Sequence, residues 1–183
     1  MRAEVRSRKA LAQVVTTLIL LVVAILISSI AIHYSINILS ARLQTEDVRL
    51  TKEHIWVNST GAVGAMKIQN LGGRDILIDK IETRGSEETW TDVYYYRVPS
   101  GTSVMGDLNV TSYDNLSGAS TTIDGKTYAQ ASSDLPLISG GELLVYIKGP
   151  DNVQVDDIGT TVSFSVFTGL SQYITECNVE SAS

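Results

Sequence analysis

The sequence predicts an α+β protein in which one long hydrophobic N-terminal helix is followed by an all-β sandwich domain. Residues 11–41 form a run of 31 positions without Asp, Glu, Lys or Arg, and 22 of these positions are apolar. After residue 49 the apolar residues come in short alternating runs separated by Gly, Asn, Asp and Ser, which is typical of antiparallel strands with one solvated face. We therefore expect a basic leader at residues 1–10, a helix at 11–49 and a β domain at 50–183.

The hydrophobic run is long enough to cross a membrane, because a bilayer core takes about 20 helical residues. No Gly precedes Gly61 and no Pro precedes Pro99, so nothing in the sequence interrupts the helix. The first ten residues carry four basic side chains and one acidic one. The positive-inside rule therefore predicts a cytoplasmic N-terminus and an external C-terminal domain. Since the run is about twice as long as the apolar centre of a secretory signal, we expect it to be retained.

One face of the expected helix is small or weakly polar. Small side chains let helix backbones approach closely, and hydroxyl groups can bond across the contact, so this stripe predicts helix-to-helix packing. The alternative is a plain membrane anchor whose hydroxyls bond to carbonyls of their own helix. The stripe follows spacings of 4, 7, 4, 3 and 4 and consists of Gln13, Thr17, Ala24, Ser28, Ala31 and Ser35.

The remaining chain predicts about eight short strands, which suits a sandwich or a barrel. The segment 99–121 is rich in Ser, Gly, Asn and Asp, and we expect an exposed excursion there. The run Tyr94 to Tyr96 alternates faces, which predicts at least one exposed ring. The expected strands lie near residues 53–58, 63–70, 75–83, 91–98, 120–129, 142–148, 160–168 and 171–178.

Three Asn-X-Ser/Thr sequons lie beyond the hydrophobic run, in expected turns or loops. They begin at Asn58, Asn109 and Asn115. On the outer face of a membrane such sites accept N-linked glycans, whose bulk requires a surface position. We therefore predict a glycoprotein that carries a glycan on at least one of the three.

The sequence offers no catalytic, cofactor or metal motif, and we expect a protein that is not an enzyme. It contains no GxSxG, GxxxxGK[ST], HExxH or CxxC pattern. The lone Cys177 permits no internal disulfide. The net charge of -6 gives no broad basic surface, so nucleic acid is not an expected partner. The acidic segment 151–157 does not match an EF-hand loop and is interpreted as a solvated turn.

The segment RSRKALAQVVTTLILLVVAILISSIAI resembles the N-terminal region of archaeal type IV pilins and their relatives, the archaellins. In that family a prepilin peptidase removes a short basic leader, the class III signal peptide, just before a long hydrophobic helix. The matching residues are Arg8, Lys9 and Ala10, which places the cut before Leu11. The segments IQNLGGRDILIDKIETRG, GGELLVYIKG and GTTVSFSVFTG look like the heads of these proteins. The resemblance thus implies an immunoglobulin-like or archaellin-like β-sandwich head.

The resemblance also implies a function and a set of partners. The chain would be a pilin of an extracellular filament that polymerises through its helix and serves adhesion or surface attachment. The implied partners are further copies of the chain, a prepilin peptidase, an assembly ATPase and a membrane platform protein, and the membrane holds the precursor as a single-pass protein. Archaellins carry Gly-rich residues after the cut, whereas this chain has Leu11-Ala12-Gln13, so a motility filament is less favoured. Two competing functions are a membrane-anchored extracellular binding module and a minor pilin.

Overall fold

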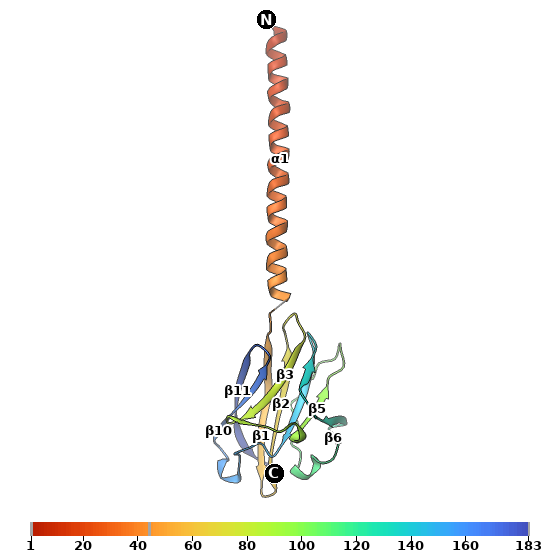
Figure 1. The fold of residues 1–183 in the computed structure, drawn as a ribbon, viewed down its shortest axis with the longest axis vertical. Helices are drawn as coiled ribbons and strands as arrows, with labels where there is room; N and C mark the ends of the chain where they lie inside the picture. Colours follow the sequence, from red (N-terminus) through yellow and green to blue (C-terminus); the bar gives the residue numbers. More distant parts are fainter. Residues whose placement is uncertain (1, 44, 183) are drawn as a thin grey trace. The chain divides into compact units, whose positions relative to one another are not determined.

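A computed structural model describes residues 2–43 and 45–182, with side chains described for 12–40 and 45–182. The chain divides into two compact units, one ending at Leu43 and the other beginning at Gln44. The first contains the helix α1 (Arg2–Leu43), and the second is a β-rich head (Figure 1). The α+β class predicted from the sequence is therefore confirmed.

The helix α1 differs from the expected helix at both ends. It begins at Arg2 and so includes most of the expected leader, whose Ala, Glu, Arg and Lys residues favour helix. It ends at Leu43, and strand β1 (Val48–Asn58) already includes residues 48 and 49, the last two of the expected helix. In β1, Val48 pairs with Asn70 of the next strand, so sheet pairing takes precedence over continued helix. The expected boundary at residue 49 was thus too far along the chain.

Among residues 45–182, eleven strands form one mixed sheet. Its order is β4-β3-β10-β11-β1-β2-β9-β5-β7-β6, and β8 pairs with the free part of β3. All neighbouring pairs are antiparallel except β1 and β11, which run parallel. After β1 the strands are β2 (Gly61–Asn70), β3 (Ile76–Thr83), β4 (Ser86–Glu87), β5 (Val93–Arg97), β6 (Ser120–Ile123), β7 (Lys126–Gln130), β8 (Leu135–Leu137), β9 (Glu142–Lys148), β10 (Thr161–Thr168) and β11 (Gln172–Ser181).

The sheet curls into a half-barrel around one main core (Figure 1). Apolar side chains from β1, β2, β5 and β9 meet side chains from β3, β10 and β11 in this core. Gly64 of β2 shows how closely the two sides approach, because a Cβ atom there would lie 3.0 Å from the Phe164 ring. Each large aliphatic side chain buried in this way contributes about 1.5 to 3 kcal/mol to folding.

A second core covers the outer face of β2, β5 and β9. Strand β9 is buried on both faces, since Val145 lies in the main core while Tyr146 lies in the second. The segment 99–121 lies over this outer face and contributes Leu108 and Leu116 to it. Most residues of this segment are exposed, as expected, but Leu108 and Leu116 are buried, which the sequence did not predict. Its leucines are buried because β9 offers them a second apolar surface.

Three further details differ from the expected strands. The single strand expected at 120–129 is a hairpin, β6 and β7, whose turn residues Asp124 and Gly125 both have positive φ, as a tight Asp-Gly hairpin requires. The short strands β4 and β8 were not expected. Tyr94 is buried and its two neighbours are half-buried, so no ring of the tyrosine run is fully exposed, contrary to the prediction.

Candidate functional site

The helix α1 presents an apolar surface along most of its length. Residues 12–40 form one continuous span that is long and apolar enough to cross a membrane. In its most apolar stretch, none of the residues is buried among the described residues. Its aliphatic side chains are exposed all around the helix, including Leu21, Val22 and Ile30. Such a surface is unfavourable in water, because each large apolar side chain left exposed forgoes about 1.5 to 3 kcal/mol of burial.

The small-residue stripe lies on one face of α1, because the helix is uninterrupted. At 100° per residue its six members fall within an arc of about 60°. Ala24 and Ser28 line a shallow open groove bordered by Leu21, Ile25 and Ile32. A second helix could lie closer to the backbone along this groove than along the rest of α1.

Some hydroxyls of this face are already bonded within the helix. Thr17 donates to the carbonyl oxygen of Val14 at 2.9 Å, and Ser35 donates to that of Ala31 at 2.9 Å. His33 Nδ1 lies 3.0 Å from the carbonyl oxygen of Ser29. These bonds satisfy the polar groups inside an apolar environment, as a lone membrane anchor would also require.

The expected processing residues lie in the first quarter of α1. The backbone of Arg8, Lys9, Ala10 and Leu11 is helical, and their side chains lie outside the described residues.

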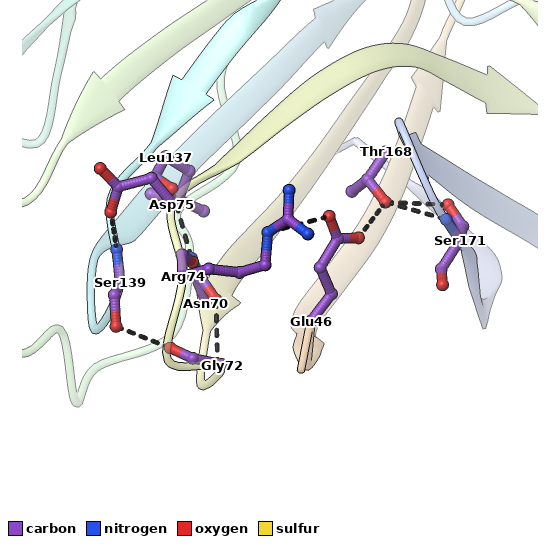
Figure 2. Close-up of polar contacts among 9 residues, drawn as sticks. All are labelled: Glu46, Asn70, Gly72, Arg74, Asp75, Leu137, Ser139, Thr168 and Ser171. Carbon is purple, nitrogen blue, oxygen red and sulfur yellow. Dashed lines mark hydrogen bonds and ion pairs between the residues drawn. The ribbon is translucent and has the colours of Figure 1, made fainter. Parts of the chain in front are cut away.

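The start of the head is fixed by a buried carboxylate (Figure 2). The Glu46 side chain is 6% exposed and precedes β1. Its Oε2 accepts a 2.7 Å hydrogen bond from Thr168 Oγ1 at the end of β10, and its Oε1 lies 3.8 Å from Arg74 Nε. The Thr168 hydroxyl is held in turn by the backbone of Ser171 in the β10–β11 turn. Glu46 thus connects the first residues of the head with two other turns.

A buried asparagine organises the neighbouring β2–β3 turn (Figure 2). Asn70 Nδ2 donates to the carbonyl oxygens of Arg74 and Leu137, and its Oδ1 accepts from Gly72 N–H. The carbonyl oxygen of Asp47 accepts from the N–H groups of Leu71 and Gly72, at 2.7 and 3.1 Å. A Cβ atom on Gly72 would lie 2.5 Å from the carbonyl oxygen of Thr45. Only glycine therefore allows residues 45–47 to lie against this turn.

We call residues 45–47 and the turns 70–75, 137–141 and 168–171 the entry end of the head. Ser139 completes it, since its hydroxyl donates to the Gly72 carbonyl oxygen at 2.7 Å and its N–H donates to the Asp75 carboxylate at 2.8 Å. The entry end includes residues from all three head segments that carry the family resemblance, IQNLGGRDILIDKIETRG, GGELLVYIKG and GTTVSFSVFTG. Sequence reasoning did not identify Glu46, Asn70 or Thr168, and the only signal was the Asn-Leu-Gly-Gly turn sequence at 70–73.

A buried ion pair holds the start of the 99–121 segment. Lys67 Nζ lies 3.0 Å from Glu142 Oε2, and both side chains are less than a tenth exposed. Glu142 also accepts from Ser103 Oγ and from Val104 N–H. Burial acts to raise the pKa of Glu142, but these donors and the Lys67 ammonium outweigh it and hold the pKa below its usual value. The pair therefore attaches the loop to β2 and β9.

Glu88 is a buried acid without a basic partner in the described residues. Burial raises its pKa to about 7, and the charges of Asp151 and Asp92 act in the same direction. Its Oε1 accepts a 3.1 Å bond from Asp151 N–H. Burial likewise raises the pKa of the half-buried Cys177 thiol to about 12, which keeps it protonated and unreactive at neutral pH.

The acidic segment 151–157 is used for internal contacts. Asp157 pairs with Arg84 at 3.0 Å, and Asp151 accepts from Ser86 Oγ at 2.9 Å. In the part of the chain that the structure describes, no group of three or more His, Cys, Asp or Glu side chains is placed to hold a metal ion.

The three sequon asparagines all lie in the head. Asn58 ends β1 and is half-buried, while Asn109 and Asn115 are exposed and lie in the segment over the second core. Asn115 belongs to a short 3-10 turn, Tyr113–Asn115. The sequence predicted turns or loops at these positions. The structure places Asn109 and Asn115 outside the strands, whereas Asn58 is the last residue of β1.

Comparison with known proteins adds no assignment. No protein-family model matches the chain, and no curated protein matches it.

Proposed function

We propose that this chain is a pilin, the structural subunit of an extracellular type IV pilus-like filament that polymerises through α1. The precursor crosses the cytoplasmic membrane with its N-terminus inside, and a prepilin peptidase cuts it between Ala10 and Leu11. The mature helix then exchanges lipid for the helices of neighbouring copies, and the heads form the outer sheath. The sheath serves adhesion or surface attachment.

One observation carries this proposal: a 29-residue apolar span without burial partners is joined to a head that has its own core. A soluble protein would bury such a helix against its own core. A filament subunit leaves the helix free, because the helix first contacts lipid and then contacts the helices of neighbouring copies. After removal of residues 1–10, the net charge of -6 loses +3 and becomes -9. This charge falls mainly on the head, where it favours solubility and opposes lateral association of filaments.

The entry end supports the same proposal, because it is where a pull on the helix would reach the head. Residues 45–47 are bonded to turns from β2–β3 and β10–β11. A load applied at residue 45 is therefore shared between strands on both sides of β1 in the sheet order. This arrangement suits a filament subunit that bears tension through its helix.

A membrane-anchored binding module is the second candidate. It is favoured by the bonds of Thr17 and Ser35 to their own helix, since these hydroxyls need no partner helix. The two candidates differ in the fate of residues 1–10, which the anchored module retains.

The test is recovery of the protein from the surface of cells that express it together with a prepilin peptidase. We expect sheared filaments that contain the chain, with Leu11 as the N-terminal residue by sequencing and mass spectrometry. Lys9→Glu should block the cut and the filaments, while Arg2→Glu, further from the cut, should leave both. An intact N-terminus on a protein that stays in the membrane fraction would favour the anchored module.

A further inference from the structure

The three sequons differ in whether the folded head leaves their reacting atoms free. N-glycosylation joins the asparagine Nδ2 to a sugar and requires a Ser or Thr hydroxyl two residues later. We propose that Asn58 is the glycan acceptor of the folded head, and that the sequons of Asn109 and Asn115 block each other through one hydrogen bond. This inference rests on the extracellular placement of the head proposed above.

The blocking bond joins Asn115 to Thr111. Asn115 Nδ2 donates to Thr111 Oγ1 at 2.9 Å. This nitrogen is the atom of Asn115 that a sugar would join, and this oxygen belongs to the hydroxyl that the sequon of Asn109 requires. Thr111 is also only 9% exposed. A single bond therefore engages one N–H of the reacting nitrogen of one sequon and the hydroxyl oxygen of the other.

The surrounding segment keeps this bond in place. The carbonyl oxygen of Asn109 accepts a 2.7 Å bond from the hydroxyl of Tyr146 in β9, and that of Asn115 accepts one of 2.7 Å from Thr121 Oγ1. Leu116, next in the chain, is completely buried in the second core. A transferase would have to lift this side chain out of its core before the segment could be extended, and exposing it to water is unfavourable.

Asn58 is arranged in the opposite way. It ends β1 at a two-residue turn, and both turn residues, Ser59 and Thr60, are exposed. Its Oδ1 accepts from the N–H of Thr60 at 2.9 Å, from the N–H of Gly61 at 3.1 Å and from the Thr60 hydroxyl. Within the described residues its Nδ2 donates no hydrogen bond. The nitrogen is therefore free, and the hydroxyl of its own sequon already faces the amide.

This arrangement suits the chemistry of transfer from a lipid-linked oligosaccharide phosphate. The bond between the anomeric carbon and the phosphate oxygen breaks, and the phosphate leaves with the bonding electron pair. A bond forms between that carbon and Asn58 Nδ2, and the proton that Nδ2 loses passes to the departing phosphate. Three donors on Oδ1 draw electron density from the amide and make its N–H protons more acidic, which favours the loss of that proton.

The position also provides a surface for the first sugar. The turn forms one wall of an open hollow of about 270 Å³, and residues 153–156 form the other. Val155 in that wall is exposed. A sugar on Asn58 would cover this side chain without displacing any part of the core.

The experiment uses the folded full chain in detergent, an oligosaccharyltransferase and its lipid-linked donor. The enzyme is one that modifies all three free peptides, residues 53–64, 104–113 and 112–121. Glycopeptide mass spectrometry then gives the occupancy of each site in the folded chain. We expect Asn58 to be modified, and Asn109 and Asn115 to reach less than a tenth of its occupancy.

Two variants test the mutual block. Asn115→Ala frees the Thr111 hydroxyl and should raise occupancy of Asn109 at least fivefold, with Asn58 unchanged. Asn115→Asp removes the same sequon but leaves an acceptor for that hydroxyl, so Asn109 should stay unmodified. Comparable occupancy of Asn58 and Asn109 in the unsubstituted chain would overturn the proposal. So would an unmodified Asn58, or an Asn115→Ala variant in which the occupancy of Asn109 does not rise. Because the reaction is performed in vitro, failure of the chain to form filaments would contradict only the proposed function.

Discussion

The carboxylate of Glu46 and the hydroxyl of Thr168 are joined by a 2.7 Å hydrogen bond across 122 positions of the chain (Figure 2). Glu46 lies just before the first strand of the sheet and Thr168 ends β10. The bond therefore secures the start of the head against a strand that lies two places from β1 in the sheet order. It is a contact that a subunit loaded through its N-terminus would place under tension.

Thr168→Val should destabilise the head. The substitution keeps the side-chain shape but removes the donor to a buried carboxylate, which costs about 1 to 3 kcal/mol. Urea unfolding followed by the fluorescence of Trp56 and Trp90, both in the head, measures the change. Thr122→Val, on an exposed position of β6, is the control and should be neutral. Equal losses in the two variants would show that the bond contributes nothing specific.

A head that begins at Thr45 should fold more stably than one that begins at Leu50. The shorter version lacks Glu46, the Asp47 carbonyl that binds the β2–β3 turn, and the buried Val48. We expect cooperative thermal unfolding and a β-type circular dichroism spectrum for the longer version, and a melting temperature lower by at least several degrees for the shorter one. Identical melting curves would mean that the entry end is not part of the folded unit.

Glu142→Gln should be strongly destabilising at neutral pH, because it leaves the Lys67 ammonium buried without its counter-charge. Loss of one partner of a buried pair costs about 3 to 5 kcal/mol. The pKa of Glu142 is lowered in the folded head, so its contribution is present at neutral pH and is lost as the pH falls through that pKa. The variant and the unsubstituted protein should therefore converge in strong acid, as measured by urea unfolding at each pH.

Asp124→Asn is the matched control for this pair. Asp124 and Lys126 form an exposed pair at 3.2 Å, and such pairs contribute about 0 to 1 kcal/mol. A similar loss in both variants would contradict the role given to burial.

Glu88→Gln should stabilise the head above neutral pH. The pKa of Glu88 is raised to about 7 in the folded state, so the folded state favours the protonated form. The cost of ionisation is absent in acid, grows as the pH rises above the unfolded-state value and is complete above about pH 7. The expected gain for the variant is up to about 3 kcal/mol at pH 8 and close to zero at pH 4. Glu87→Gln removes an exposed carboxylate next to Glu88 in the chain and is the matched control.

Ser28→Leu should prevent filament formation without preventing membrane insertion. Added volume is accepted at a lipid-facing position but not in a close helix contact. Ser29→Leu makes the same change about 100° away on α1 and should leave more filaments. The amounts of sheared filament and of membrane-inserted precursor are measured for both. If Ser28→Leu and Ala31→Leu both form normal amounts of filament, the result supports the alternative in which α1 is a plain membrane anchor.

The sequence by itself determined α1 and most strands. A helix is built from neighbours in the chain, so an unbroken apolar run without Gly or Pro was sufficient to predict it. The alternation in β3 and β10 likewise predicted their positions within one residue. The run Leu143 to Ile147 is apolar without alternation, a signal of burial on both faces that could have revealed the second core.

The tertiary structure decided which distant residues meet. Leu108 and Leu116 look like isolated apolar residues in a polar segment, and only the outer face of β9 makes them core. The end of α1 was misplaced because pairing of Val48 with β2 depends on a strand that comes later in the chain. The partners of Glu46, and the bond between Asn115 and Thr111, depend on backbone positions set by the whole fold. Local sequence specifies the elements because their bonds are local, whereas contacts between turns exist only after the sheet has closed around its core.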